Sequence, residues 1–166
     1  MVTSNSIFAE NCKKMSKVLI LMGSKSDEPV MNDCKRYLDW FGIENEMLVA
    51  SAHRDPEKVV DLVTKAKDNG YSCIIGAAGM AAALPGVISA HTSLPVLGVP
   101  LDGGLPGGID ALYSIVQMPP GLPVGTLAVG KPGARNAAIL AARIIALSNT
   151  AIDAKLEEFK VLNYKI

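Results

Sequence analysis

The sequence predicts an α/β fold built on a doubly wound parallel sheet. Short apolar runs alternate along the chain with longer segments in which apolar residues recur at helical spacing, and this alternation is typical of βαβ units. Hydrophobic residues make up 49% of the chain and aromatic residues only 5%, so aliphatic side chains carry most of the apolar content. Such a composition suits helices packed on a parallel sheet. The length of 166 residues predicts one domain.

Five short apolar runs are predicted to be strands. The first, from Lys17 to Met22, is long enough for a buried strand and too short for a helix, and it stops at Gly23. The third leads into a segment of small residues, and the fourth begins at Pro95. The predicted strands cover residues 17–22, 45–50, 72–77, 95–99 and 124–129.

The segments between the strands are predicted to be helices. The first helix is marked by apolar residues at helical spacing and a glycine stop, namely Val30, Cys34, Leu38, Phe41 and Gly42. Pro56 opens the second helix, since proline is favoured in a first turn. The later helices are predicted from about 56 to 70, from within 76–86 to about 92, at 109–117, at 133–147 and at 150–162.

The predicted helix 133–147 is apolar on nearly every side. A surface helix normally keeps a polar stripe, whereas a helix that is apolar all round is buried. Burial of both faces of a helix in a single outer layer would require another subunit, so this helix predicts a homo-oligomer. The alternative is a wide core face with alanines at its margin.

Residues 1–16 are polar and aperiodic, so they are predicted to be a flexible extension preceding one domain at 17–166. They lack the apolar core of a signal peptide, and no apolar run approaches the ~20 residues of a membrane span. Three cysteines, Cys12, Cys34 and Cys73, have neither metal-ligand nor redox spacing, which fits a reducing compartment. We therefore expect a cytoplasmic protein that has no membrane partner.

Charge and motif patterns point away from several classes of partner. The formal net charge is zero and no basic stripe is present, so we expect no nucleic-acid partner. The segment from Gly125 to Lys131 has the spacing of a phosphate-binding P-loop, but Pro132 supplies no hydroxyl for magnesium and the segment is predicted to be a strand. The chain has no H-E-x-x-H motif and no paired-cysteine zinc pattern. We expect neither a metal nor an organic cofactor.

The loop after the first predicted strand, residues 23–27, has the features of an anion site. It combines backbone donors at a helix start with the hydroxyls of Ser24 and Ser26 and the carboxylate of Asp27. Asp27 could instead cap the helix, which is a common position for aspartate.

The loop after the second predicted strand contains Ser51, His53 and Arg54. An arginine fork binds phosphate or carboxylate, and a histidine can transfer protons near neutral pH. Taken alone, His53 and Arg54 could equally be ordinary polar loop residues.

The loop after the third predicted strand, residues 76–86, consists almost wholly of small residues and includes Ala78, Gly79 and Leu84. Small residues allow a planar ligand to approach the backbone, and they also serve tight helix–sheet packing. Successive loops of a doubly wound parallel sheet meet on one rim. The three loops would then form one pocket for a phosphorylated planar molecule, with His53 as its only obvious proton carrier.

Four ordered segments resemble the class I PurE family, the N5-carboxyaminoimidazole ribonucleotide mutases: MGSKSD at 22–27, SAHR at 51–54, AAALPG at 81–86 and YSIVQMP at 113–119. The resemblance runs from about Lys17 to the last helix. It implies a flavodoxin-like, three-layer αβα fold, a homo-octamer with active sites at subunit contacts, and no metal or organic cofactor.

The resemblance also implies an activity and a set of site residues. A carboxyl group would move from the exocyclic N5 to ring carbon C4 of an aminoimidazole ribonucleotide in purine biosynthesis, with His53 as the catalytic proton shuttle. The substrate-binding residues would be Ser24, Ser26, Asp27, Ser51, Arg54, Ala78, Gly79 and Leu84.

One position departs from the family pattern, because Ala83 stands where the family has a histidine. His91 cannot replace it from the same helix, since eight residues correspond to about 12 Å of axial rise. Two alternatives to the mutase therefore stay open: direct carboxylation of the aminoimidazole ribonucleotide by CO2, and a nucleotide-binding homologue impaired in catalysis. Arg54 and the Leu-Pro-Gly sequence at 84–86 favour the mutase.

Overall fold

The computed structural model describes residues 16–166, so almost all of the predicted N-terminal extension lies outside the described residues. Five parallel strands form one sheet in the order β2-β1-β3-β4-β5. The strands are β1 Lys17–Met22, β2 Glu44–Val49, β3 Tyr71–Gly79, β4 Val96–Leu101 and β5 Gly125–Thr126. The helices are α2 Glu28–Phe41, α3 Pro56–Ala66, α4 Leu84–Ala90, α5 Ile109–Val116, α6 Lys131–Ala146 and α7 Thr150–Val161, with short 3-10 turns at Lys25–Asp27 and Pro106–Gly108.

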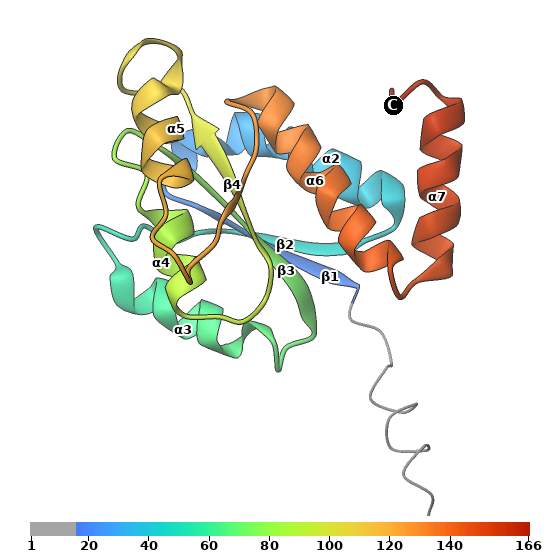
Figure 1. Ribbon diagram of the computed structural model, residues 1–166, viewed down its shortest axis with the longest axis horizontal. Helices are drawn as coiled ribbons and strands as arrows, with labels where there is room; N and C mark the ends of the chain where they lie inside the picture. The colour runs from blue at the N-terminus through green and yellow to red at the C-terminus, as the bar shows by residue number, and fades with distance from the viewer. Residues whose placement is uncertain (1–15) are drawn as a thin grey trace, which may run out of the picture.

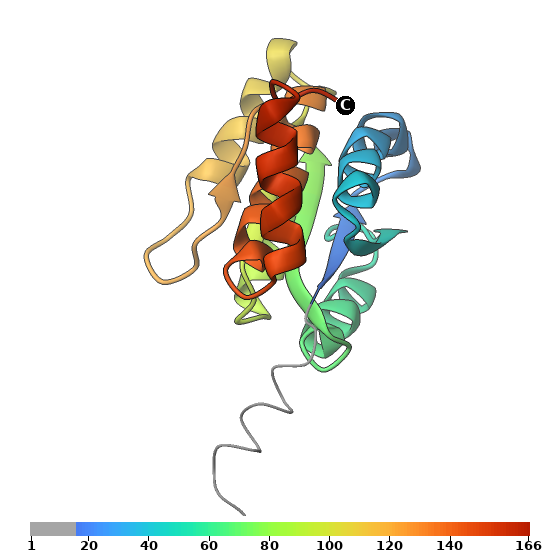
Figure 2. The same ribbon diagram turned by 90° about the vertical axis from the view of Figure 1, so that its right-hand side faces the viewer.

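Helices cover both faces of the sheet, which confirms the predicted three-layer, flavodoxin-like α/β fold (Figures 1 and 2). A separate apolar core lies on each face of the sheet. Side chains along a strand alternate between the faces, so Leu19 and Leu21 of β1 join one core while Ile20 and Met22 join the other. The first face packs against α3, α4 and α5, and the second against α2 and α6, on which α7 packs in turn. The carboxyl ends of all strands consequently meet at one edge, where the βα loops emerge.

The third strand is longer than predicted, and the fifth is shorter. Strand β3 continues to Gly79, so Ala78 and Gly79 belong to the strand end rather than to a loop. The predicted strand 124–129 keeps a regular ladder only at Gly125–Thr126. Beyond it, Leu127 N donates to Gly98 O at 2.9 Å and Gly130 N to Pro100 O at 2.8 Å. Three residues of this edge segment therefore match two residues of β4, which breaks the regular pairing.

Most of the apolar surface of α6 is covered within the chain, so the composition of this helix does not by itself require a second subunit. Its alanines pack on the sheet and on α2, and α7 lies along its other side (Figures 1 and 2). The exposed positions of the helix include Asn136 and Arg143. The wide core face, the alternative interpretation of this helix, matches the observed packing.

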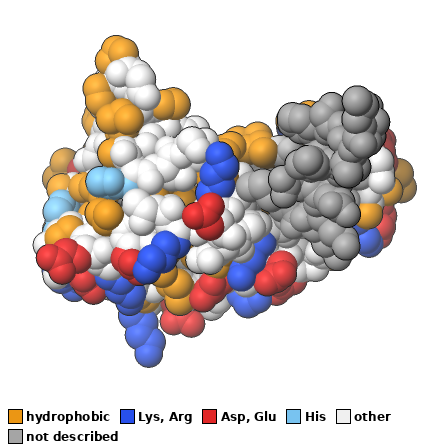
Figure 3. All heavy atoms as spheres, turned by 90° about the horizontal axis from the view of Figure 1, so that it is seen from below, with side chains coloured by type: hydrophobic (Ala, Val, Ile, Leu, Met, Phe, Trp, Pro, Cys, Tyr) orange, Lys and Arg blue, Asp and Glu red, His pale blue; other side chains and the backbone are white. Residues whose placement is uncertain are grey.

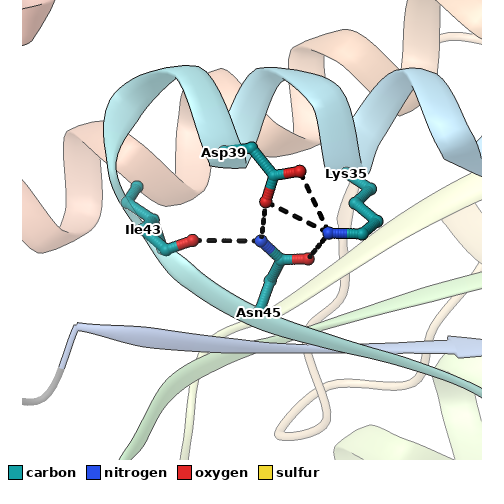
Figure 4. A network of polar contacts seen from close by, with 4 residues as sticks. All are labelled: Lys35, Asp39, Ile43 and Asn45. Carbon is teal, nitrogen blue, oxygen red and sulfur yellow. Dashed lines mark hydrogen bonds and ion pairs between the residues drawn. The ribbon is translucent and has the colours of Figure 1, made fainter.

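A polar network fixes the turn between α2 and β2 (Figure 4). Asn45 Nδ2 donates to Asp39 Oδ1 at 2.7 Å and to Ile43 O at 3.0 Å, while Lys35 Nζ lies 3.0 Å from Asp39 Oδ2. Burial alone would raise the pKa of Asp39, but hydrogen bonds from Asn45 and Lys35 outweigh it and lower that pKa. The network anchors the start of the edge strand that leads to the Ser51–Arg54 loop.

Cys34 and Cys73 lie in the core as free thiols, as predicted from their positions in apolar patterns. Burial raises the pKa of the Cys73 thiol to about 12, so this thiol stays protonated and unreactive. Among the described residues, no helix is long and apolar enough to cross a membrane. Figure 3 shows acidic and basic side chains interspersed over one face, without a patch of a single sign there.

We expect Gly133→Ala to lower the free energy of unfolding by about 1–3 kcal/mol, the usual cost of overpacking. Glycine-to-alanine changes inside helices normally stabilise them, but a Cβ at this buried position would overlap the backbone carbonyl of Ala128, which cannot move aside. Urea denaturation measures the change. Asn136→Ala, at an exposed position of the same helix, is the matched control. A Gly133→Ala variant as stable as the parent would contradict the packing described.

Candidate active site

A pocket of about 710 Å³ opens at the edge of the sheet where the strands end. Its walls come from the loops that follow β1, β2, β3 and β4, so the expected convergence of successive loops occurs. The pocket lining includes every residue that the sequence predicted for the site: Ser24, Ser26, Asp27, Ser51, His53, Arg54, Ala78, Gly79 and Leu84.

The loop after β1 is closed by its own hydrogen bonds. Ser24 Oγ accepts from Ser26 N at 3.3 Å and from Ser26 Oγ at 2.9 Å, and Asp27 Oδ2 accepts from Ser24 N at 2.9 Å. Asp27 therefore completes a capping box on the short 3-10 turn and makes no side-chain cap on α2.

These bonds change how this loop can hold an anion. The N–H groups of Gly23, Ser24, Ser26 and Asp27 all have acceptors within the protein, so the predicted cradle of free backbone donors is mostly occupied. Anion recognition at this loop must rely more on the serine hydroxyls and on neighbouring cations. Burial raises the pKa of Asp27, although the Ser24 N–H, Ser26 and the charge of Arg54 act in the opposite direction.

The guanidinium of Arg54 bridges two of the loops. Arg54 Nη2 donates to Gly23 O at 2.8 Å, and Arg54 Nε donates to Ser51 Oγ at 3.3 Å. These contacts orient the planar fork before any ligand arrives, which lowers the entropy cost of binding an anion. The next residue, Asp55, caps α3 by accepting from Lys58 N at 3.3 Å, so the loop ends on a fixed helix start.

His53 lies exposed on the pocket wall between these anchored neighbours. Within residues 16–166 no hydrogen bond to its imidazole is found, which leaves both ring nitrogens available to a ligand. The other histidine, His91, ends α4 and does not line the pocket. His53 is therefore the one imidazole positioned to exchange protons with a molecule bound there.

The wall after β3 is built from small residues, as predicted. A Cβ on Gly79 would lie 3.2 Å from Leu101 O, so glycine allows the ends of β3 and β4 to approach closely. Ala83 stands at the cap of α4 and lines the pocket, and Leu84 is buried beneath it.

The end of β4 and the loop after it contribute residues that were not predicted for the site: Leu101, Asp102 and Gly103. The prediction also omitted Gly23, Ala52, Met80, Ala81 and Ala83 from the binding set. Residues 100–108 lie between the strand predicted at 95–99 and the helix predicted at 109–117, and they are rich in glycine and proline, so they too form a loop at the end of a strand. Its place in the pocket depends on β4 lying beside β3 in the sheet.

The comparisons with known proteins agree with one another. A family model described as AIR carboxylase matches residues 17–165. The N5-carboxyaminoimidazole ribonucleotide mutase of Vibrio cholerae serotype O1 is 52% identical over 141 residues, which cover 85% of this chain and 88% of that protein. The mutase of Escherichia coli K12 is 47% identical over 145 residues, or 87% and 86% of the two chains.

The solved structures include a close match in fold. The crystal structure of Treponema denticola PurE has a TM-score of 0.81 and 30% sequence identity, and the match covers 89% of this chain and 91% of that one.

We expect Arg54→Lys to weaken the binding of a phosphate monoester by about tenfold, or roughly 1.4 kcal/mol. Lysine keeps the charge but cannot hold both Gly23 O and Ser51 Oγ while presenting a fork to the ligand. Titration calorimetry with ribose 5-phosphate measures the effect. Arg143→Lys, on the exposed face of α6, is the control. Equal affinities for the parent and Arg54→Lys would show that Arg54 does not contact the phosphate.

Proposed function

This chain belongs to the AIR carboxylase family, and from that premise we propose that it is an N5-carboxyaminoimidazole ribonucleotide mutase. The observation that carries the proposal is the identity of about half of all positions, over most of the chain, to relatives that bear this name. These relatives do not favour direct carboxylation by CO2 or a loss of catalysis, the two alternatives left open by the sequence.

The polar part of the pocket suits the ribose phosphate of such a substrate. We assign the phosphate to the hydroxyls of Ser24 and Ser26 and to the guanidinium of Arg54, which Ser51 orients. Asp27 faces the same space, and its carboxylate suits a ribose hydroxyl better than a phosphate because like charges repel.

The small-residue wall suits the aminoimidazole ring. Ala78 and Gly79 offer a flat surface without side chains that would crowd a planar ligand, and Leu84 closes it from below. The wall offers no nucleophile, so it would not capture CO2 released beside it.

His53 is proposed to carry the protons. When the N5–carboxyl bond breaks, its electron pair returns to N5, which takes up a proton, and CO2 is released. Ring carbon C4 then attacks the CO2, and C4 loses a proton as the new carbon–carbon bond is completed. One proton is gained and one is lost, so a single imidazole can serve both steps. The carboxyl group that is transferred comes from the substrate itself, so the reaction requires no metal or organic cofactor.

We further propose that the protein is a cytoplasmic homo-oligomer, with the octamer as the state implied by the PurE resemblance. Support comes from exposed apolar side chains along one side of α5 and the loop before it, namely Leu105, Ile109, Tyr113 and Val116. A second copy of the chain could cover such a surface. Light scattering at micromolar concentration would return a multiple of the 17.4 kDa chain mass, and a monomer mass would contradict the proposal.

We expect His53→Asn to abolish conversion of the N5-carboxylated nucleotide while leaving its binding within about tenfold, or 1.4 kcal/mol. Asparagine keeps a polar group of similar reach but cannot exchange protons near neutral pH. Product analysis by chromatography measures turnover, and calorimetry measures binding of the product nucleotide. His91→Asn, outside the pocket, serves as the control. An active His53→Asn enzyme would remove His53 from the mechanism.

We expect Ala83→His to raise kcat/KM, because it restores the imidazole that the family has at this position of the pocket wall. General acid–base groups contribute about 10²–10⁴-fold, so even partial recovery is measurable. Ala81→His adds the same ring to the same loop at another pocket position and is the matched control. If Ala83→His is slower than the parent at every pH, the site is already complete around alanine.

A further inference from the structure

We propose that Met80 forms an apolar lip at the pocket opening and determines how much of the released CO2 is recaptured at C4 rather than lost to solvent. This inference rests on the proposed mutase function, in which Met80 neither binds the phosphate nor transfers a proton. Three kinds of observation support it: the exposure of Met80, its backbone conformation and its contact across the pocket rim.

Met80 differs from the other large apolar residues of the pocket. Leu84 and Leu101 are 2% and 3% exposed and form part of the core, whereas Met80 is 61% exposed and also lines the cavity. A large apolar side chain that contacts both the cavity and solvent marks the boundary between them. Along residues 77–83 it is the one side chain that belongs to neither alanine nor glycine.

The backbone holds Met80 in a conformation that favours glycine. Its φ is +55°, in the left-handed region, and the other described non-glycine residues with positive φ lie at the carboxyl end of the chain, at Asn163 and Tyr164. Hydrogen bonds fix this turn, since Ala82 N donates to Met80 O at 2.9 Å and Ala83 N to Ala81 O at 2.7 Å. Strained residues of this kind concentrate at functional sites because the surrounding structure must hold them in place.

The side chain of Met80 lies against the loop that follows β4. A Cβ on Gly104 would come within 3.3 Å of Met80 Cγ and would overlap the Asp110 carboxylate, so only glycine fits between these two groups. Asp110 Oδ2 accepts from Leu105 N at 3.1 Å and holds the loop in this position. Gly103 and Asp102, next in the loop, line the same pocket. Met80 therefore reaches from the β3 side of the pocket rim to the β4 side.

Such a lip matters for a reaction with a free intermediate. After the N5–carboxyl bond breaks, CO2 is bound by no covalent bond until C4 attacks it, and escape through the opening competes with capture. CO2 is small, uncharged and weakly held by polar groups, so its retention depends on how well the opening is closed. A thioether side chain fills an irregular gap, excludes water and offers no amine or hydroxyl to react with CO2.

The test compares Met80→Gly, Met80→Ala and Met80→Leu with the parent. Each enzyme converts the N5-carboxylated nucleotide in buffer that contains ¹³C-labelled bicarbonate and carbonic anhydrase. The assay measures total consumption, the ratio of decarboxylated to C4-carboxylated nucleotide after subtraction of the enzyme-free reaction, and the ¹³C content of the C4 carboxyl group. Val161→Ala, an 84% exposed position on α7, is the control.

We expect Met80→Gly and Met80→Ala to raise the decarboxylated fraction and the ¹³C incorporation by about threefold or more, with consumption changed much less. Met80→Leu, which keeps an apolar side chain of similar size, should restore the parent ratio. Met80→Gly also relieves the left-handed backbone, so its melting temperature should not fall, and misfolding cannot account for the altered ratio.

Two results would overturn the inference. Product ratios and label contents equal to the parent's in both Met80→Gly and Met80→Ala would show that Met80 does not retain CO2. If the Met80 variants formed less of the decarboxylated and of the C4-carboxylated nucleotide in the same proportion, the role of Met80 would be merely structural. A parent enzyme that forms no C4-carboxylated nucleotide would instead refute the proposed function, and the inference would fall with it, so the two failures are distinguishable.

Discussion

Buried strands must find hydrogen-bond partners for all their backbone groups, and the architecture of this protein follows from that requirement. Strands β1, β3 and β4 are buried almost throughout, so their backbone groups must pair with neighbours on both sides. Helical crossovers between the strands satisfy this demand with a parallel sheet, whose strands all end at the same edge. Loops separated by some 80 residues of sequence therefore meet around one pocket.

Glycine and alanine let the helices approach this sheet closely and so bring the small-residue wall into position. A Cβ on Gly76 would lie 2.8 Å from Ile88 Cδ1, and one on Gly98 would overlap Ile115. Helices α4 and α5 therefore pack closer to the sheet than they could if larger residues replaced these two glycines. Because α4 begins at the pocket, this packing also sets the position of Ala83 and Leu84 relative to His53.

The site combines rigid and accessible parts in a way that suits a reaction with an unbound intermediate. Arg54 and Ser51 are held by hydrogen bonds, and the loop after β1 is closed on itself, so the region assigned to the phosphate is preorganised. His53 and Met80 line the same cavity, and both are exposed. Rigid binding of the non-reacting part of a substrate leaves the reacting groups in a fixed place while protons and CO2 move.

Local patterns in the chain were enough to predict the succession of strands and helices and the burial of Cys34 and Cys73. They also predicted the loops that carry Ser24, His53 and Arg54, because these residues directly follow the apolar runs that become strands. Three features could be seen only in the folded chain. The loop of Asp102 lies beside that of Gly79, and α6 is buried between the sheet, α2 and α7. The backbone N–H groups of the Gly23–Asp27 loop already have acceptors within the protein. Each of these outcomes depends on which distant segments pair or on which acceptor lies nearest in space, and neither has a local signature in the sequence.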